Sequence, residues 1–421
     1  MRLVIHKGAS EVGGNCIQLI SEGKSIFLDA GVPLEELEDK DKKPDLIDFS
    51  KIKASNKSTI LGILLSHAHQ DHFLSLKNAG DIPIFTGEPS YGMLKVLKDF
   101  SMDGDVPLEN VAIFKDGEKF NIGPFTITPI LVDHSIYDAH AFYITDGDSS
   151  VLYTGDIRFH GRKKHMMEKV FDRFASPDIL LVEGTNILET GDKAIYKDEN
   201  SLEEPMTKFM NKTKGLSLVV CSSMNIDRVV TVFKAALKAK RELIIDLYTA
   251  EILRAVGNYK IPNTSWPNVH LYLNGYHRGI VKRNGFFDMV KGHGSGRLFE
   301  EEINKNRSKY VLLYKKSNYK FLEKNNLLDD SSMIYSIWEG YLEKEKSLND
   351  LLDFYKIPFK FIHISGHMYK NNLVSLVEKL KPKTIIPIHT NNKEMFREFE
   401  NAVLLDNGEE YELQGGNNKM S

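Results

Sequence analysis

The sequence predicts an α/β fold with more than one domain, and three observations support this prediction. Short apolar runs typical of buried strands follow one another before about residue 187. After that point strands and helices alternate, and this βαβ pattern is typical of a parallel sheet. The chain has 421 residues, which is too long for one small domain and suggests about two to three.

The N-terminal part is expected to contain mainly strands. A hairpin is expected at residues 16–28, turning at Glu22 and Gly23. Residues 59–65 form a short apolar run of the kind that fills a buried strand. Apolar residues recur at helical spacing in residues 89–100, which predicts a helix. Further strands are expected at residues 3–6, 125–132, 141–145, 151–153 and 179–182.

The second part alternates between the two kinds of element. A helix is expected at residues 201–212, because Ser201 and Glu204 match a capping box at its start. Residues 274–297 are rich in glycine and basic residues, and we expect a loop-rich stretch there. Strands are expected at residues 216–221, 242–247, 311–314, 332–336, 359–363 and 384–388, and helices at residues 228–240 and 370–380.

The composition restricts the class of protein to which this chain can belong. Apolar residues make up 42% of the chain and charged residues 27%, which is ordinary for a globular protein. The net charge of −3 excludes a basic surface over the whole protein but not a local basic groove. Cys16 and Cys221 cannot form a disulfide framework, which favours a reducing compartment. Since no membrane-spanning run and no signal peptide are recognisable, we expect a cytoplasmic protein without a membrane partner.

The most informative stretch is 66-SHAHQDHF-73, which directly follows an apolar strand. In an extended segment His67 and His69 point the same way, so this pair could hold one metal ion. Asp71 and His72 add a second nitrogen and oxygen pair, which suits two metals roughly 3.5–4 Å apart. Imidazole and carboxylate ligands favour zinc or a similar transition ion over calcium or magnesium.

Four other apolar strands end in a residue that can bind a metal. These residues are Asp29, His134, Asp156 and His389. Taken singly, an aspartate after a strand is more often a turn former, and a lone histidine is more often a structural side chain. Together they supply the number of ligands that two metals need.

These residues carry a resemblance to a known family. HAHQDH, with Asp29, His134 and Asp156 in this order, resembles the metallo-β-lactamase superfamily. Downstream segments resemble the motifs of the β-CASP nucleases, which include RNase J and the RNA 3′-end processing nucleases. The matching segments are GASEVGGNCIQL (8–19), YTGDIRFHGR (153–162), LLVEGTN (180–186), SSMNIDRVVTVFKAALKAKRELIID (222–246), HISGHMYKNNL (363–373) and IIPIHT (385–390).

The resemblance implies a fold and a domain order. It implies an α/β metallo-β-lactamase αββα sandwich into which a β-CASP α/β domain is inserted. The sandwich would consist of residues 1–189 and 366–414, and the inserted domain of residues 190–365. Residues 415–421 are expected to form a disordered tail.

The resemblance also implies a role for each matching residue. One metal would be held by His67, His69 and His134, the other by Asp71, His72 and His389, and Asp156 would bridge them. Asp29 would orient the ligand loop from the second shell of the site. Glu183 would hydrogen-bond His367 and keep it protonated. The catalytic residues would then be Asp71, Glu183 and His367. Two zinc ions are expected, with manganese able to replace them.

The implied function is hydrolysis of RNA in RNA processing or decay. A hydroxide activated by two metals would attack phosphorus in a single-stranded RNA. His389 favours RNA, because the DNA-repair branch of the family tends to have valine there. The alternatives are a DNA nuclease of the same fold, a small-molecule hydrolase acting on thioesters or lactams, and a non-catalytic RNA-binding protein. Exonuclease or endonuclease cleavage and the oligomeric state stay open.

Candidate RNA contacts lie outside the metal ligands. They are Arg158, Arg162, His363 and Ser365. The basic residues of segment 274–297 are equally consistent with an RNA backbone contact and with a solvated loop. Tyr276, Phe286 and Phe287 could stack on bases, although burial is the default expectation for them.

Overall fold

The computed structural model describes residues 1–39, 41, 43–56, 58–100, 106–174, 176–188 and 195–413. The expected tail at 415–421 lies outside the described residues. The chain divides into two compact units, the first comprising Met1–Lys193 and Gly366–Ser421 and the second comprising Ala194–Ser365. The inserted domain expected at 190–365 overlaps the second unit.

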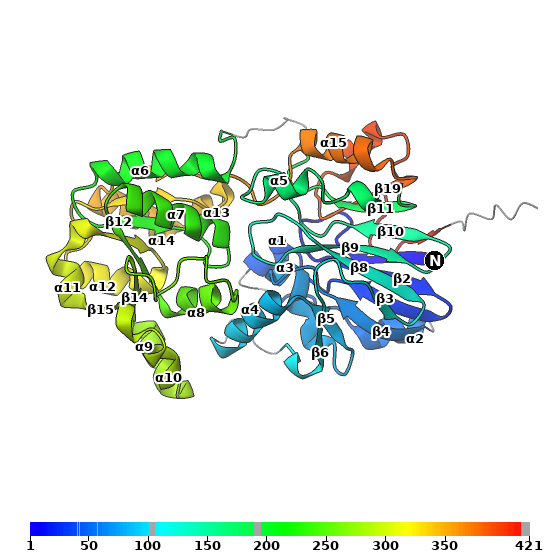
Figure 1. Cartoon of the computed structure of the whole chain (residues 1–421), viewed down its shortest axis with the longest axis horizontal. Coiled ribbons are helices and arrows are strands. Elements are labelled where there is room, and N and C mark those ends of the chain that lie inside the picture. The colour runs from blue at the N-terminus through cyan, green and yellow to red at the C-terminus, as the bar shows by residue number, and fades with distance from the viewer. Residues whose placement is uncertain are drawn as a thin grey trace, which may run out of the picture. The chain divides into compact units, whose positions relative to one another are not determined.

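The first unit contains two sheets (Figure 1). The strands of one sheet are β1 (Arg2–Lys7), β2 (Cys16–Ser21), β3 (Lys24–Leu28), β4 (Thr59–Leu64), β5 (Ile84–Thr86), β6 (Val111–Ile113) and β20 (Glu410–Glu412). The strands of the other are β7 (Phe120–Ile122), β8 (Phe125–Leu131), β9 (His140–Thr145), β10 (Ser150–Tyr153), β11 (Ile179–Glu183) and β19 (Thr384–Ile388). Their orders are β20-β1-β2-β3-β4-β5-β6 and β19-β11-β10-β9-β8-β7.

One apolar core joins the two sheets. Successive side chains of a strand point to opposite faces, so alternate residues such as Phe125 and Ile127 of β8 reach the same core. The core draws on both sheets and includes Leu3, Ile5, Ile17, Leu19, Ile26, Leu28, Phe142, Tyr153, Leu181 and Ile386. Each fully buried side chain of this kind contributes roughly 1.5–3 kcal/mol, so this core dominates the stability of the unit.

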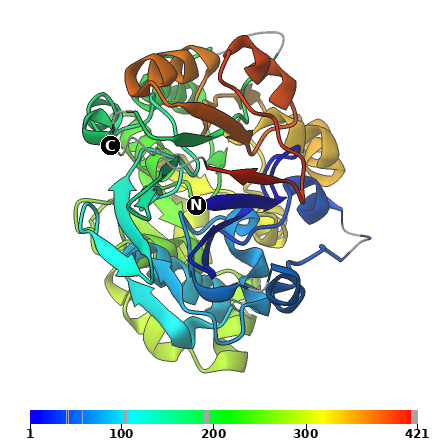
Figure 2. The same cartoon turned by 90° about the vertical axis from the view of Figure 1, so that its right-hand side faces the viewer.

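Short helices and 3₁₀ turns accompany these sheets. They are α1 (Leu34–Glu38), α2 (Phe49–Asn56), α3 (Gln70–Phe73), α4 (Glu88–Asp99), α5 (Lys164–Met167) and α15 (Lys370–Leu380), with 3₁₀ turns η1 (Leu74–Asn78), η2 (Leu108–Asn110), η3 (Asp172–Phe174) and η8 (Lys393–Glu398). Figure 2 shows α15 on the outer side of the sheet that contains β19. Met93, Leu94 and Leu97 of α4 are buried, as their helical spacing predicts.

The second unit is built on one parallel sheet. Its strands are β12 (Ser217–Val220), β13 (Glu242–Ile245), β14 (Val269–Tyr272), β15 (Arg297–Leu298), β16 (Tyr310–Leu313), β17 (Ser332–Tyr335) and β18 (Phe359–Phe361). Their order is β15-β14-β13-β16-β12-β17-β18, and every pairing is parallel. This confirms the sheet type that the alternation of strands and helices predicted.

The helices of the second unit connect these parallel strands. They are α6 (Glu203–Lys212), α7 (Ile226–Lys238), α8 (Leu247–Ala255), α9 (Gly275–Asn284), α10 (Phe287–Lys291), α11 (Glu300–Lys305), α12 (Tyr319–Lys324), α13 (Glu339–Lys344) and α14 (Lys346–Tyr355). The 3₁₀ turns are η4 (Glu199–Leu202), η5 (Gly294–Gly296), η6 (Arg307–Lys309) and η7 (Lys316–Asn318). A second apolar core lies on this sheet and includes Leu218, Ile244, Leu312, Leu322 and Tyr335.

Two local predictions for the second unit are wrong. Segment 274–297 is mainly helical, because the Asn274 side chain caps the start of α9 by accepting from the backbone N–H of His277 at 2.9 Å. Gly285 ends that helix with a left-handed φ of 71°. The capping box near residue 201 belongs to Asp198 and Ser201, so the chain turns helical earlier than Ser201 and Glu204 predicted.

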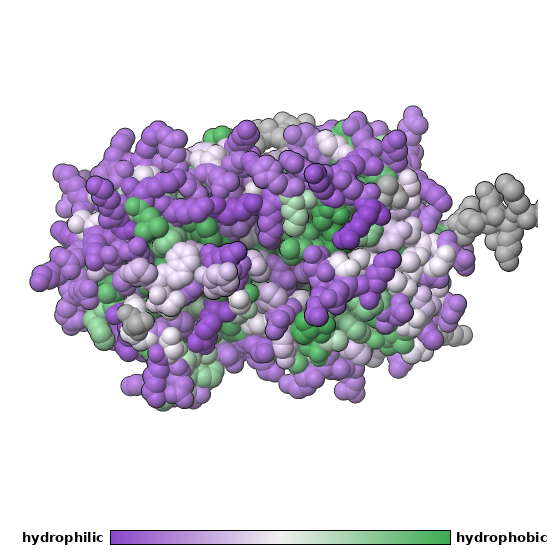
Figure 3. Space-filling model, viewed as in Figure 1, coloured by the Kyte–Doolittle hydropathy of each residue, from purple (hydrophilic) through white to green (hydrophobic). Residues whose placement is uncertain are grey.

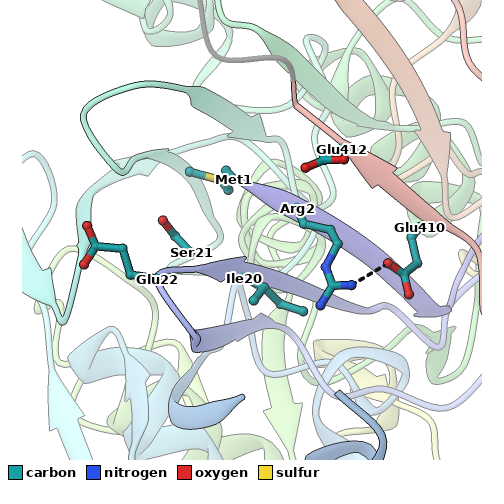
Figure 4. A pocket seen from close by; sticks show the side chains of 7 residues that line it. All are labelled: Met1, Arg2, Ile20, Ser21, Glu22, Glu410 and Glu412. Carbon is teal, nitrogen blue, oxygen red and sulfur yellow. Dashed lines mark hydrogen bonds and ion pairs between the residues drawn. The ribbon is translucent and has the colours of Figure 1, made fainter. Parts of the chain in front are cut away.

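No helix among the described residues is long and apolar enough to span a membrane. A surface hollow lies where β1, β2 and β20 meet, and its lining includes Glu22, Glu412 and the ion pair of Arg2 with Glu410 (Figure 4). Glu22 precedes β3, whereas Asp29 follows it, so the hollow lies at the opposite end of the strands from the predicted metal ligands.

Candidate metal centre

The predicted metal ligands follow the carboxyl ends of neighbouring strands. Asp29 follows β3 and the segment HAHQDH follows β4, and these two strands pair in parallel. Asp156 follows β10, Glu183 is the last residue of β11 and His389 follows β19, and β11 pairs in parallel with both other strands. Because parallel strands point the same way, their carboxyl ends meet at one edge of each sheet. The topology thus gathers side chains that are far apart in the sequence.

Three histidines and one carboxylate form the first ligand group. His67 Nε2 and His134 Nε2 lie 3.1 and 3.2 Å from His69 Nδ1. Asp156 Oδ2 lies 3.7 Å from His67 Nε2 and 3.8 Å from His134 Nε2. Ligand atoms at about 2.0–2.2 Å from a tetrahedral zinc stand roughly 3.3–3.5 Å apart, so this group suits one such ion.

The second ligand group lies beside the first and includes the same aspartate. Asp71 Oδ2 lies 3.2 Å from His389 Nε2 and 3.8 Å from His72 Nε2. Asp156 Oδ2 lies 3.2 Å from His72 Nε2, and its Oδ1 lies 3.6 Å from His389 Nε2. All four residues of this group are buried, and their ligand atoms lie within 4.8 Å of one another.

Asp156 provides the test of whether these residues fit a metal. Its Oδ1 is buried and accepts no hydrogen bond from the part of the chain that the structure describes. An unpaired buried carboxylate oxygen is costly, whereas a bound cation would satisfy it. The donor set of imidazole nitrogens and carboxylate oxygens is also the set that zinc prefers. The residues therefore fit metal binding, with one carboxylate shared between two groups.

Hydrogen bonds behind the ligands orient one histidine of each group. His72 Nδ1 lies 2.7 Å from Asp29 Oδ2, so the carboxylate accepts a hydrogen bond from the Nδ1–H of the ring. Ser66 Oγ donates to the same Oδ2 at 2.7 Å and therefore accepts from His67 Nδ1 at 3.0 Å. Both rings then direct their Nε2 toward the ligand groups. Asp29 thus orients His72 directly and His67 through Ser66.

Asp29 is itself held by further donors. It adopts a left-handed φ of 57°, which is uncommon for a residue other than glycine. The Ser66 backbone N–H donates to Oδ1 at 2.6 Å, and the Tyr153 hydroxyl donates to Oδ2 at 2.5 Å. Asn15 Nδ2 donates to that hydroxyl at 3.0 Å. These bonds offset the backbone strain and fix the carboxylate that orients the histidines.

Two more ligand histidines have their second ring nitrogen occupied. His134 Nδ1 donates to the Gly366 carbonyl oxygen at 2.7 Å. His389 Nδ1 lies 2.9 Å from Thr185 Oγ1. Each contact points Nε2 at the ligand groups, in the way that outer hydrogen bonds prepare a metal ligand.

Burial and charge set the protonation states of the site. Burial lowers the pKa of His67 and His134 well below the usual range and that of His69 to about 4, which favours the neutral imidazole that binds metals. Burial also opposes charge on His72, but neighbouring carboxylates, that of Asp156 first, outweigh it and raise its pKa well above the usual range. Burial opposes ionisation of Asp156, yet the surrounding histidines hold its pKa well below the usual range.

Glu183 and His367 lie next to the two ligand groups. His367 Nδ1 lies 3.3 Å from Glu183 Oε1, 3.2 Å from Thr185 Oγ1 and 3.8 Å from Asp156 Oδ2. Burial lowers the pKa of His367, but the carboxylates of Glu183 and Asp156 outweigh it and raise the pKa to about 9. The imidazolium is therefore the predominant form at neutral pH. Glu183 is fully buried and accepts from the Ile157 backbone N–H at 3.2 Å.

Two glycines allow the chain to pass close to α3. A Cβ atom on Gly31 would lie 1.6 Å from the carbonyl oxygen of Asp71. Gly13 has φ of 81°, and a Cβ there would lie 2.7 Å from the Asp71 Cβ atom. A larger residue at either position would displace the helix that carries two ligands.

The candidate RNA contacts differ in their exposure. Arg158 is fully buried, and its Nε lies 3.3 Å from Asp133 Oδ1. The guanidinium of Arg158 is thus not presented at the surface, and its contact with RNA stays a prediction. Arg162, His363 and Ser365 are partly exposed.

Sequence reasoning missed three residues that support the ligands. Ser66, Tyr153 and Thr185 each donate to or accept from a side chain of the site. Ser66 stands directly before His67, and Thr185 stands two residues after Glu183. The available signal for Ser66 was a small hydroxyl residue next to a ligand, and that for Thr185 was a small hydroxyl residue close to Glu183.

Comparisons with known proteins agree with this geometry. Residues 44–192 match the model of the beta-lactamase superfamily domain, and residues 358–401 match that of the Zn-dependent metallo-hydrolase RNA specificity domain. The chain is 24% identical to Ribonuclease J of Sinorhizobium meliloti, over 91% of this chain and 67% of that protein. Both matched segments thus resemble metal-dependent hydrolases of the beta-lactamase superfamily, and the Ribonuclease J relative is similar over most of this chain.

Other proteins match this chain over almost its whole length. Ribonuclease J of Mycoplasma genitalium is 24% identical over 94% of this chain and 68% of its own length. Ribonuclease J of Mycolicibacterium smegmatis is 22% identical over 100% of this chain and 76% of its own length. A crystal structure of a protein of unknown function from Enterococcus faecalis covers 97% of this chain and 99% of its own, with a TM-score of 0.72 and 18% identity. That structure supports the fold of this chain.

Proposed function

We propose that this chain is a zinc-dependent ribonuclease that hydrolyses phosphodiester bonds of single-stranded RNA. The observation that carries the proposal is the position of the Glu183–His367 pair beside two metal-ligand groups that share Asp156. His367 and His389 also fall within the matched RNA specificity domain. The Ribonuclease J relatives support RNA as the substrate of this site.

The proposed centre holds two ions. One would be bound by His67, His69 and His134, the other by Asp71, His72 and His389, with Asp156 shared. Bound zinc, or manganese in its place, would lower the pKa of a coordinated water so that hydroxide is present at neutral pH. Asp29 and Ser66 would keep the histidines in the tautomer that leaves Nε2 unprotonated.

His367 supplies the proton chemistry of the chain itself. Its Nδ1 faces Glu183, so its Nε2–H is the ring donor directed toward a substrate. A protonated imidazole there would stabilise charge on a phosphoryl oxygen or protonate the leaving oxygen. Glu183 acts through His367, because it is buried and accepts bonds from the backbone on its other side.

A DNA nuclease of the same fold and a thioester or lactam hydrolase are the alternatives. Neither accounts for the match of residues 358–401 to an RNA specificity domain. A thioester or lactam hydrolase also has no need of a second charged donor such as His367 beside the water-activating centre. A comparison of cleavage rates on matched RNA and DNA strands distinguishes a ribonuclease from a DNA nuclease. Thioester turnover without nuclease activity would establish the small-molecule hydrolase.

The test uses RNA labelled at its 5′ end and bearing either a monophosphate or a triphosphate. Zinc- or manganese-loaded wild type should cleave it, and the double variant Asp71→Ala, His72→Ala should not. Release of mononucleotides from the 5′ end identifies an exonuclease, and internal fragments identify an endonuclease. The matched control is Asp148→Ala, His165→Ala, since both residues are exposed and neither belongs to a ligand group. Equal cleavage by the ligand variant and the control would disprove the metal assignment.

A further inference from the structure

The helices α9 and α10 form an extension of the second unit, here named the α9–α10 arm and comprising residues 275–291. In Figure 1 the arm projects from the sheet of its unit. His277, Ile280 and Val281 are buried and attach α9 to the unit. The Asn274 side chain caps α9 and also donates from Nδ2 to Ser317 Oγ at 3.0 Å. The arm is therefore a defined structure with one attached face and one face toward solvent.

The solvent face of the arm is basic. Residues 275–291 contain four lysine and arginine side chains and one carboxylate, in a chain whose net charge is −3. Arg278 pairs with Glu300 at 3.0 Å and Lys291 with Asp288 at 2.9 Å. Lys282 and Arg283 are exposed and have no acidic partner within the described ranges of the chain. The α9–α10 arm thus holds positive charge that the protein itself does not neutralise.

Aromatic side chains accompany these charges. Tyr276 and Phe287 are each 56% exposed, although an aromatic ring of this size normally buries most of its surface. Tyr276, Gly279 and Arg283 lie three and four residues apart, so they share one face of α9. The space-filling view shows hydrophilic side chains with a few apolar ones among them over the region of the arm (Figure 3).

The chemistry of this face matches a single-stranded nucleic acid. Unpaired cations attract phosphates, and exposed aromatic rings offer surfaces on which bases stack. A solvated surface explains the lysine and the arginine but does not explain two half-exposed aromatic rings on the same arm. We propose that the α9–α10 arm is an RNA-binding surface, with Lys282 and Arg283 contacting phosphates and Tyr276 and Phe287 stacking on bases. This inference rests on the proposed ribonuclease function.

RNA binding is measured under conditions that prevent cleavage, so that the contribution of the arm is tested separately from that of the metal centre. The full chain in EDTA is titrated with a labelled unstructured RNA, and fluorescence anisotropy is followed over a series of salt concentrations. Lys282→Glu, Arg283→Glu should raise Kd about tenfold. It should also make the slope of log K against log salt shallower by about 1.4, since each phosphate contact to a single strand contributes about 0.7. Tyr276→Ala, Phe287→Ala should raise Kd at least about fivefold with the slope unchanged.

The matched control reverses two other exposed charges of the second unit, Lys305 and Lys320, to glutamate. This control should change Kd less than twofold, and circular dichroism checks that every variant is folded. Equal weakening by the control, or wild-type binding by the arm variant, would overturn the proposal. So would an arm variant that keeps its affinity for RNA but changes its sedimentation, because the arm would then bind protein. If the wild type neither binds nor cleaves RNA, the ribonuclease function itself fails; if it does both and only the arm result is negative, the arm alone is wrong.

Discussion

Replacement of Ser66 by alanine should weaken one metal site and spare the other. Ser66 Oγ lies between Asp29 Oδ2 at 2.7 Å and His67 Nδ1 at 3.0 Å. His72 Nδ1 reaches the same Oδ2 directly at 2.7 Å. Alanine therefore removes the acceptor that orients His67 in the first ligand group. The acceptor that orients His72 in the second group, the Asp29 carboxylate, stays in place.

The magnitude follows from the burial of the ring. His67 is 0% exposed, so its Nδ1–H is left without an acceptor in a place that water does not reach. A buried donor without an acceptor costs about 1–3 kcal/mol. The ring avoids this cost by moving its proton to Nε2, and the metal must then reverse that change. Loss of such an outer hydrogen bond weakens metal binding about 10–100-fold.

The assay is titration of metal-depleted protein with zinc in competition with a chromogenic chelator. The wild type should bind two ions. Ser66→Ala should bind one of them about 10–100-fold more weakly and the other within about threefold of the wild type. Ser66→Thr is the matched control, because it keeps the hydroxyl group and should restore the affinity. Equal weakening of both sites, or of neither, would refute the orientation of His67 through Ser66.

Three other substitutions test separate parts of the structure. Cleavage that needs the His367 imidazolium is complete below its pKa of about 9 and is lost as pH rises through that value. Bound cations lower the pH at which His367 loses this proton. The variant Glu183→Gln removes a carboxylate that stabilises the imidazolium, so it should move the alkaline limb of the pH–rate profile to a still lower pH than in the wild type. Gly31→Ala should lower the free energy of unfolding by about 1–3 kcal/mol in urea denaturation, because its Cβ overlaps the backbone of α3. Glu199→Ala should lower it by about 3–5 kcal/mol, because Arg228, whose Nε lies 2.8 Å from Glu199 Oε1, is then buried without a counter-charge. If any of the three variants shows the wild-type pH profile or unfolding free energy, the role assigned to the corresponding contact is wrong.

Local patterns predicted much of the fold. The apolar run at residues 59–65 is the buried strand β4, and the helical spacing at 89–100 corresponds to α4. Both signals depend on residues close together in the chain, so the sequence displays them directly. The prediction for residues 274–297 failed because glycine and basic residues suggested a loop. Asn274 and Gly285, as helix caps, were the better guide to the helices that form there.

The residues that can bind metals are recognisable in the sequence, since HAHQDH is dense in ligands and Asp29, His134, Asp156 and His389 each end an apolar strand. How these residues meet depends on the folded chain. The parallel pairing of β10, β11 and β19 brings Asp156 between the two ligand groups. Tertiary contacts also place Arg158 against Asp133 inside the protein, although its sequence position suggested an exposed contact. Spacing along the chain can show which chemical groups are present, but their burial and partners depend on segments that meet only after folding.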